Sequence, residues 1–416
     1  MSKCTKNSDT ILEKIKIFND PIYGFITIKN ALIFNIIEHP LFQRLRRITQ
    51  MGLSYLVYPG AHHTRFHHAI GCIYLMQKAI DTLRMKQVEI SDEEEEGLYI
   101  AILLHDIGHG PFSHALEKII IKKKNHEELS LHFMEHLNKE FDGGLDLAIE
   151  IFKGAYHRKF MHQLISSQLD MDRLDYLKRD SFYSGVAEGN INSDRLISML
   201  DVKNDQLLID IKGIYSVEKF IVARRLMYWQ VYLHKTSLAA EQILVKILQR
   251  AKTLIENGAS LNASRPLLYF MSNNVDTESF SDYNLTMFSK LDDFDIISAL
   301  KEWSNHNDLI LSSLSSSIID RKLPKVEIQN NIFTDSYFKK ISKKVSKTYL
   351  IDIENVNYFV FQGKVENRAY NAEIERINIL DKNGKVTDIV EASDDLSMSG
   401  LSNSVTKYFI CYPKLY

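Results

Sequence analysis

Apolar residues recur with a period of about 3.6 residues, the period of an α-helix, over most of residues 34–345. This pattern constrains the fold more than any other feature, because an amphipathic helix must bury its apolar stripe against neighbouring elements. A capping box at Ser91-Asp92-Glu93-Glu94 predicts the start of one helix that runs through Leu103. Two short segments, residues 24–29 and 206–212, look like strands. The sequence therefore predicts a mainly α fold with a helical core and short β-hairpins.

The pattern changes after about Thr348, where runs with the composition of strands replace the helical repeat. These runs cover residues 349–353, 358–365, 372–380 and 385–390. The last two flank a turn whose residues suit a β-hairpin, Asp381-Lys382-Asn383-Gly384. We therefore expect a large helical domain over residues 1–345, with its core at about 40–250, and a small α+β C-terminal region over residues 346–416.

The chain carries 51 lysine and arginine residues against 53 acidic residues, a formal net charge of −2. The chain therefore has no overall basic excess that would indicate nucleic acid as a partner. Nucleic acid stays possible as a partner. The three cysteines, Cys4, Cys72 and Cys411, are far apart and lack a Cys-x-x-Cys pair, which fits a reducing compartment. Because no apolar run is long enough to span a bilayer and no signal-peptide pattern opens the chain, we expect a cytoplasmic protein without a membrane partner.

Histidines are concentrated in one part of the chain. Ten of the fifteen lie between His62 and His136, a window of 75 residues in which even spreading would place about three. Histidine is neither a preferred core residue nor a strong helix former, so this concentration indicates chemistry. Neutral imidazole is a common metal ligand, and its pKa allows proton transfer near neutral pH. Some of the ten, including His132 and His136, are expected to be ordinary surface residues.

The densest part of this window, residues 103–114, places the pair His105-Asp106 at the end of an apolar helical run. Adjacent helical residues point roughly 100° apart, so this pair reaches one ion only at its shared edge, and other helices must supply further ligands. The candidates are His68 upstream and Asp172 downstream. Two imidazoles and two carboxylates suit Mn, Fe, Co, Ni or Zn better than calcium. Taken singly, His68 is better explained as a loop cap and Asp172 as part of a salt bridge.

Several motifs, in the same order along the chain, resemble the HD-domain superfamily, which is named for its His…His-Asp…Asp metal site. They are most similar to its deoxynucleoside triphosphate (dNTP) triphosphohydrolases, including the mammalian type that carries a sterile-alpha-motif domain. The resemblance spans about residues 19–248, and we identify no such motif in the C-terminal region. The matching motifs are Asn19-Asp20-Pro21-Ile22-Tyr23-Gly24, Pro40-Leu41-Phe42-Gln43-Arg44-Leu45-Arg46, Tyr58-Pro59-Gly60-Ala61, Arg65-Phe66-His67-His68, the segment 103–114, His126-Glu127, Leu169-Asp170-Met171-Asp172-Arg173-Leu174-Asp175-Tyr176, and Arg224…Tyr232-Leu233-His234-Lys235.

The resemblance implies that His68, His105, Asp106 and Asp172 are the four ligands of a divalent metal ion, with Mn, Fe, Mg, Zn, Ni and Co as the candidates. It also implies the reaction. Metal-activated water attacks the α-phosphorus of a dNTP and releases the deoxynucleoside and intact triphosphate.

Four further residues receive catalytic roles from the resemblance. His114 is the candidate general acid for the 5′ oxygen of the leaving deoxynucleoside. His126 is a second catalytic histidine, oriented by Glu127, and His109 is expected to face the phosphates. A purely structural role is the alternative for each of these three histidines.

The substrate contacts are likewise implied by the resemblance. A triphosphate requires cations, which would be Arg65, Arg173 and Lys235, with arginine at 173 where the mammalian enzyme has lysine. The pair Gln50-Met51 stands where the family has a Gln-Leu pair that crowds C2′ of the sugar and binds its 3′ hydroxyl, and methionine keeps the bulk while adding flexibility. Taken singly, each of these is an ordinary surface or core residue. The other expected contacts come from Tyr176 (ribose), Asp180 (phosphate), Tyr232 (sugar), Arg224 and Tyr228.

An activator site is also implied. Gln43 and Arg46 match positions that hold a guanine nucleotide, dGTP or GTP, in activated relatives, and Glu38 replaces an aspartate there. A solvated basic helix face is an equally good explanation of residues 43–47. Such an activator site lies between subunits, so it implies a homo-oligomer, either a dimer or a tetramer.

Two other functions fit the same motifs. One is an HD phosphohydrolase that acts on nucleoside monophosphates or other phosphate esters. The other is a nucleotide-sensing or nucleic-acid-binding protein whose metal site is only structural. The complete set of ligands, acid and cations favours the dNTP triphosphohydrolase.

Overall fold

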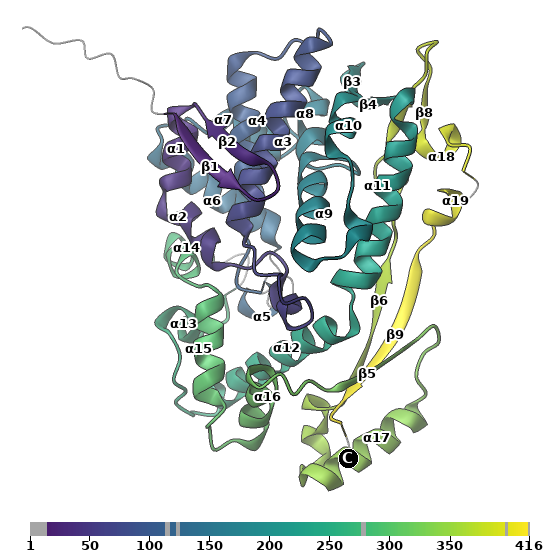
Figure 1. Cartoon of the computed structure of the whole chain (residues 1–416). Coiled ribbons are helices and arrows are strands. Elements are labelled where there is room, and N and C mark those ends of the chain that lie inside the picture. The colour runs from purple at the N-terminus through teal and green to yellow at the C-terminus, as the bar shows by residue number, and fades with distance from the viewer. Residues whose placement is uncertain (1–14, 113–116, 122–124, 276–279, 396–397, 415–416) are drawn as a thin grey trace, which may run out of the picture.

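The computed structural model describes residues 15–112, 117–121, 125–275, 280–395 and 398–414, and most of them lie in helices. This confirms the predicted mainly α fold with a helical core. Figure 1 shows the helices gathered into one body, along whose side the long strands β6 and β9 run down towards α17. No helix among the described residues is long and apolar enough to span a bilayer.

The N-terminal part forms a hairpin that is followed by short helices. Strands β1 (Lys16–Asp20) and β2 (Gly24–Ile28) pair antiparallel, and Gly24 takes the positive φ of +75° that the turn requires. The short helices that follow carry the candidate activator residues and the Gln50-Met51 pair. They are α1 (Ala31–Glu38), α2 (Pro40–Gln43), and the 3₁₀ helices η1 (Arg44–Arg47) and η2 (Gly52–Leu56).

Three helices form the centre of the helical body. Helix α3 (Arg65–Met85) packs against both α4 (Asp92–Leu104) and α9 (Met171–Ser184). The predicted capping box opens α4, since the Ser91 hydroxyl accepts from the Glu94 amide at 3.1 Å and the Glu94 carboxylate accepts from the Ser91 amide at 2.9 Å. The packing of α3 between the other two brings residues about a hundred positions apart in the chain to one place.

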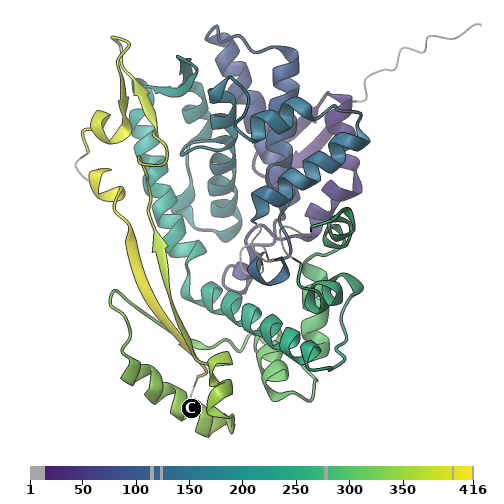
Figure 2. The ribbon, with the colours of Figure 1, turned by 180° about the vertical axis from the view of Figure 1, so that it is seen from behind.

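The remaining helices surround this centre and extend the body downwards. Figure 2 shows α12, in teal, running below the purple and blue helices towards the green helices that follow it, and α12 packs on α13 and α16. These helices are α5 (Glu117–Ile120), α6 (His126–Glu140), α7 (Asp146–Phe152), α8 (Lys159–Ile165), η4 (Ala187–Gly189), α10 (Ser193–Ser198), η5 (Ile211–Gly213), α11 (Ile214–Met227), the π-helical turn η6 (Tyr228–Tyr232), α12 (Lys235–Glu256), α13 (Arg265–Ser272), α14 (Asp282–Ser289), α15 (Asp293–Trp303), α16 (Leu309–Ile319), α17 (Asp335–Tyr349), η7 (Ile353–Tyr358), α18 (Ile389–Ala392) and α19 (Met398–Leu401).

Two small sheets connect the C-terminal region to the helical body. One has the order β5-β9-β6 and is antiparallel, whereas the other has the order β3-β4-β7-β8, with β7 parallel to β4. The predicted hairpin turn is present between β7 and β8, with Gly384 at a φ of +79°. The strands are β3 (Leu200–Lys203), β4 (Gln206–Asp210), β5 (Lys325–Gln329), β6 (Phe361–Asn367), β7 (Asn378–Leu380), β8 (Val386–Asp388) and β9 (Val405–Tyr412).

The predicted strand at residues 349–353 is wrong. Tyr349 is the last residue of α17, Leu350 follows with a φ of +52°, and η7 begins at Ile353. The apolar and β-branched composition of this run resembles a strand, but α17 continues through Tyr349, with Ile341 and Val345 buried on its apolar face. Composition over five residues does not separate a helix end from a strand.

The division at residues 345 and 346 stays a prediction, but the two parts are joined closely. Helix α17 runs across that position, and β5 on one side pairs with β9 on the other. Strand β7 of the C-terminal region also extends the sheet begun by β3 and β4.

Arg44, which is completely buried, holds the segment that follows α4. Its guanidinium donates to the carbonyl oxygens of Ile107 at 2.7 Å and His109 at 2.6 Å. We predict that Arg44→Met lowers the free energy of unfolding by about 3 kcal/mol, because two buried carbonyls lose their donors. Urea denaturation measures this change. Replacing the exposed Arg195 by methionine is the control, and equal losses in the two variants would contradict the prediction.

Candidate metal centre

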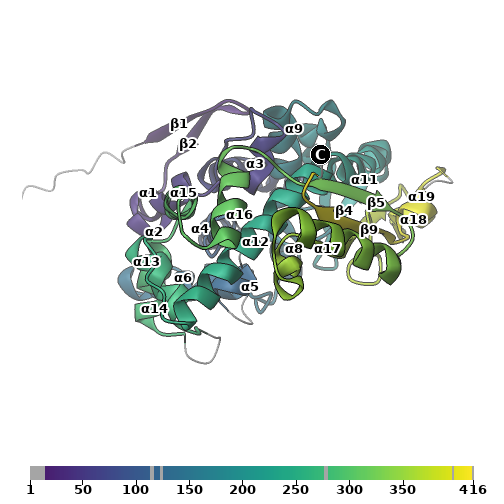
Figure 3. The same ribbon diagram turned by 90° about the horizontal axis from the view of Figure 1, so that it is seen from below.

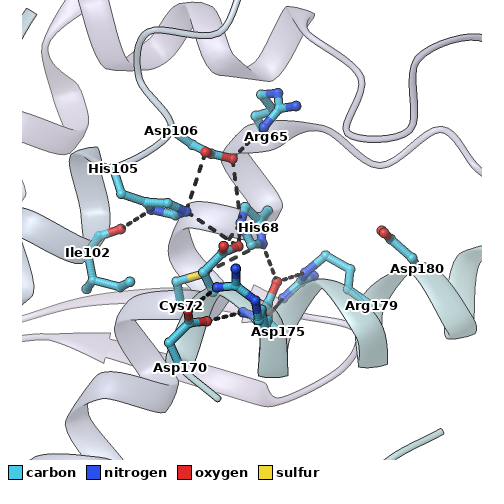
Figure 4. A network of polar contacts seen from close by, with 12 residues as sticks. Arg65, His68, Cys72, Ile102, His105, Asp106, Asp170, Asp175, Arg179 and Asp180 are labelled. Atoms are coloured by element: carbon cyan, nitrogen blue, oxygen red, sulfur yellow. Dashed lines mark hydrogen bonds and ion pairs between the residues drawn. The ribbon is translucent and has the colours of Figure 1, made fainter. Parts of the chain in front are cut away.

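The four predicted metal ligands come from three helices and meet in the interior. His68 lies on α3, and His105 and Asp106 follow α4 (Figure 4), whereas Asp172 lies on α9. The Nε2 atom of His68 is 3.1 Å from Asp172 Oδ1 and 3.7 Å from Asp106 Oδ2. The Nε2 atom of His105 is 3.5 Å from Asp106 Oδ1 and 3.6 Å from Asp172 Oδ1. Two imidazoles and two carboxylates therefore lie close together, and their role as the ligand set stays a prediction.

Neighbouring groups orient both imidazoles. The Nδ1 atom of His68 donates to Asp175 Oδ2 at 2.8 Å, and that of His105 donates to the carbonyl oxygen of Ile102 at 2.7 Å. Because Nδ1 donates, the neutral form of each ring keeps its lone pair on Nε2, the atom that would bind a metal. Within the described part of the chain, the buried Nε2 of His105 has no hydrogen-bond partner. The residues present thus fit a divalent cation with a preference for nitrogen and oxygen ligands.

The two carboxyl groups are held in the ionised form. Burial raises the pKa of Asp106, but His109 and His105 hold that pKa well below its usual range. Burial also raises the pKa of Asp172, but the adjacent His105 and His68 outweigh that effect and lower the pKa. Arg65 adds an ion pair to Asp106. Both carboxylates therefore remain available as anionic ligands.

A buried ionic chain supports His68 from behind. Arg179 donates through Nε and Nη2 to Asp175 at 2.8 and 2.9 Å, and through Nη1 to Asp20 at 2.8 Å. Burial raises the pKa of Asp175, but Arg179 and His68 bring it to about 2. Gly71 leaves room for this contact, since a Cβ there would lie 2.1 Å from Asp175 Oδ1. Sequence reasoning assigned no role to these residues, although Asp175 and Asp20 stand inside matching motifs.

Cys72 also borders the cluster, and sequence reasoning missed it too. Its Sγ lies 3.5 Å from Nδ1 and 3.6 Å from Nε2 of His68, so it sits beside the ring rather than along the direction in which Nε2 points. Burial raises the pKa of the Cys72 thiol, which keeps it protonated. This placement fits a packing neighbour of His68.

The predicted catalytic histidines differ in how well the structure places them. His109 Nδ1 is 3.3 Å from Asp106 Oδ1, and its ring stacks on that of His126 with centroids 4.0 Å apart. Glu127 is exposed in the first turn of α6. His114 lies outside the described residues. The structure therefore brings His109 and His126 to the metal ligands, and the catalytic roles stay predictions.

Residues predicted to contact the substrate come from α3, α9 and α11. Arg173 forms an ion pair with Asp170, and Arg224 donates to Gln168 Oε1 at 3.2 Å. Burial raises the pKa of Tyr176, and both arginines act against this rise. The three side chains are therefore neighbours. Lys235 is exposed at the first position of α12.

Aromatic rings form the neighbouring wall of the site. Sequence reasoning missed His63, which also lies there. The ring of Tyr232 packs against those of Tyr176 and Tyr228, with centroids 6.1 and 5.1 Å apart. The Tyr232 hydroxyl donates to Asp180 Oδ2 at 2.8 Å, and His63 Nε2 is 2.7 Å from Asp180 Oδ1. The side chain of Asp180 is therefore held between Tyr232 and His63.

The candidate activator residues lie together at the surface. Arg46 donates to Gln43 Oε1 at 2.8 Å, and Gln43 donates to the carbonyl oxygen of Ile37 at 2.7 Å. Glu38 is exposed and close enough to raise the pKa of Arg46, which burial lowers. The activator role itself stays a prediction.

Comparison with known proteins decides the family. Residues 65–180 match the HD domain, and residues 191–265 match the HD associated region. An uncharacterized protein of Bacillus subtilis is 33% identical over 422 residues, which cover 97% of this chain and 93% of that protein. The chain belongs to the HD-domain phosphohydrolase family. HD domains bind divalent metals, and the cluster described above is able to hold such an ion in this HD-domain protein.

Other relatives extend the comparison. The HD-domain protein matches the crystal structure of a phosphohydrolase from Bacteroides thetaiotaomicron with a TM-score of 0.93 and 51% identity, over 96% of this chain and 100% of that one. It is 31% identical over 260 residues to a deoxynucleoside triphosphate triphosphohydrolase homolog from Dictyostelium discoideum. That match covers 58% of this chain and 50% of the relative, so the chain matches half the length of that protein.

We predict that Asp175→Asn weakens divalent metal binding by about 10- to 100-fold, because it removes the carboxylate that orients His68. Isothermal titration with Mn²⁺ measures the affinity. The matched control is Glu94→Gln, since Glu94 is another buried acid and pairs with Arg158 at 2.8 Å, but it does not contact the metal ligands. Equal affinities in both variants would show that Asp175 does not orient the ligand.

Proposed function

We propose that this HD-domain protein is a metal-dependent dNTP triphosphohydrolase, which converts a dNTP to deoxynucleoside and triphosphate. One observation carries this proposal: three arginines from three helices lie around the candidate metal ligands and the adjoining Tyr176. Arg65 contacts the ligand Asp106, Arg173 follows the ligand Asp172, and Arg224 neighbours Tyr176. In the described part of the chain, the buried Nε atoms of Arg173 and Arg224 have no hydrogen-bond partner. Buried donors of this kind suit a polyanion such as a triphosphate.

The sugar would lie against the aromatic wall and the Gln50-Met51 pair. Met51 is buried, and the buried Oε1 of Gln50 has no hydrogen-bond partner among the described residues. An unpaired acceptor in this position suits a hydrogen bond from a sugar hydroxyl. A sugar without that hydroxyl would leave the Gln50 amide unsatisfied. Tyr176 and Tyr232 supply apolar surface for the deoxyribose ring.

The chemistry requires a nucleophile, charge neutralisation and a proton for the leaving group. A divalent ion, when bound, acidifies water and polarises a phosphoryl oxygen. The water oxygen bonds to the α-phosphorus, the bond from phosphorus to O5′ breaks, and O5′ takes a proton from the general acid, for which we propose His114. Arg65, Arg173 and Arg224 balance the charge of the phosphates, while His109 contacts Asp106 and stacks on His126.

The proposal extends to regulation and assembly. Glu38, Gln43 and Arg46 would bind dGTP or GTP as an activator at an interface between subunits, which makes the working form a homo-oligomer in the cytoplasm. Relatives described as dNTP triphosphohydrolases, at 31% identity for the Dictyostelium protein, support the choice of substrate.

We expect purified protein with Mn²⁺ or Mg²⁺ to release triphosphate from dNTPs and to hydrolyse ribonucleotides much more slowly. Ion chromatography identifies the phosphate product, with and without dGTP or GTP. Replacing His105 by alanine should abolish turnover. Release of single phosphates, equal turnover of ribonucleotides, or hydrolysis restricted to monophosphates would each contradict the proposal.

Met51→Leu should sharpen sugar selection, because leucine has fewer rotamers than methionine and crowds C2′ more rigidly. We expect the ratio of kcat/KM for dATP over ATP to rise about threefold, equivalent to about 0.7 kcal/mol. The change Met287→Leu on α14 replaces another buried methionine and serves as the control. An unchanged ratio would show that residue 51 does not read the sugar.

A further inference from the structure

Asp293, the first residue of α15, accepts three hydrogen bonds from two distant loops. Its Oδ2 accepts from the backbone amide of Thr49 at 2.8 Å and from the Thr49 hydroxyl at 2.7 Å. Its Oδ1 accepts from the backbone amide of Phe112 at 2.9 Å. Figure 3 shows α15 on the same side of the molecule as α1 and α2, which precede the first of these loops. One carboxylate thus joins segments that are far apart in the sequence.

Both segments belong to the proposed active site. Thr49 directly precedes the Gln50-Met51 pair, and Phe112 lies between the metal ligand Asp106 and residue 114 in the chain. Phe112 adopts a φ of +47°, which residues with a side chain rarely adopt. The hydrogen bond to Asp293 holds the backbone at this unfavourable position.

The helix itself does not require this carboxylate. Asp292 caps α15, and Asp295 completes the capping box by accepting from the Asp292 amide at 2.8 Å. Burial raises the pKa of Asp293 to about 6, although Thr49 and Phe112 donate to it. An ionised group at such a site costs stability, so a role in the active site explains it better than a role in the fold.

We propose that Asp293 is a positioning residue that sets the Gln50-Met51 segment and the Phe112 loop relative to each other. The segment that selects the sugar and the loop that leads to the candidate general acid would then be held by the same carboxylate. The inference rests on the proposed function for its link to sugar selection. The contacts of Asp293 with Thr49 and Phe112 stand independently of it.

The test compares Asp293→Asn with Asp295→Asn. The first keeps the size of the side chain but replaces an acceptor oxygen by a donor, so it loses a bond to Thr49 or Phe112. The second weakens the same helix end without touching either loop. Hydrogen exchange of the protein, without metal or nucleotide, reports on residues 48–52 and 108–112. We expect faster exchange in both segments in Asp293→Asn only.

Sugar selection provides a second readout that a merely structural role would not change. In Asp293→Asn we expect the ratio of kcat/KM for dATP over ATP to fall about tenfold, while Asp295→Asn keeps the wild-type ratio. Thr49→Val removes only the hydroxyl contact and should produce a smaller fall, about threefold, which keeps the test open if Asp293→Asn does not fold.

Each outcome decides one point. The inference is overturned if hydrogen exchange in both segments is unchanged in Asp293→Asn. It is also overturned if the ratio of kcat/KM for dATP over ATP is the same in Asp293→Asn, Thr49→Val and Asp295→Asn. If the wild-type protein hydrolyses no dNTP, the proposed function fails, and the exchange measurement alone then decides whether Asp293 anchors the two segments.

Discussion

The ionic chain from Asp20 through Arg179 and Asp175 to His68 is the interaction on which the rest of the structure depends. Arg179, Asp175 and His68 are fully buried or nearly so, and buried charges destabilise a protein unless they are paired and hydrogen-bonded. The chain connects the N-terminal hairpin, α9 and α3, so these elements cannot shift without breaking it. It also orients the imidazole of His68. The geometry of the candidate metal centre therefore depends on the packing of the core.

The segment after α4 is held in a similar way by residues from elsewhere. Arg44 donates to its carbonyls, and the Ser130 hydroxyl donates to the carbonyl oxygen of His105 at 2.7 Å while accepting from the Gly108 amide at 2.9 Å. A Cβ on Gly108 would lie 2.3 Å from the Ser130 backbone nitrogen, so α6 approaches as closely as only glycine allows. Asp292 and Asp293 hold the next loops through Arg47, Thr49 and Phe112. Irregular loops in the site are thus fixed by side chains on regular helices, which favours precise catalytic geometry.

The C-terminal region contributes more to the fold than its sequence pattern suggests. Strand β7 pairs with β4, and β9 lies between β5 and β6, so both sheets contain strands from either side of residue 345. Sequence analysis found the hairpin around Gly384 but missed β5 and β9, whose pairing partners lie far away in the chain. Such pairings are decided by which edges meet in space, and local composition carries little information about that.

The sequence by itself determined the helical class and the start of α4, and it singled out residue types that are able to bind a metal, because helical period, capping chemistry and ligand chemistry are all local properties. Only the tertiary structure decided which groups orient those residues. Asp175 stands 107 positions from His68, His63 stands 117 from Asp180, and Asp293 stands 244 from Thr49. Each of these partners is an ordinary acid or histidine in the sequence. Its role arises only when helix packing brings it within hydrogen-bond distance and removes the water that would otherwise compete.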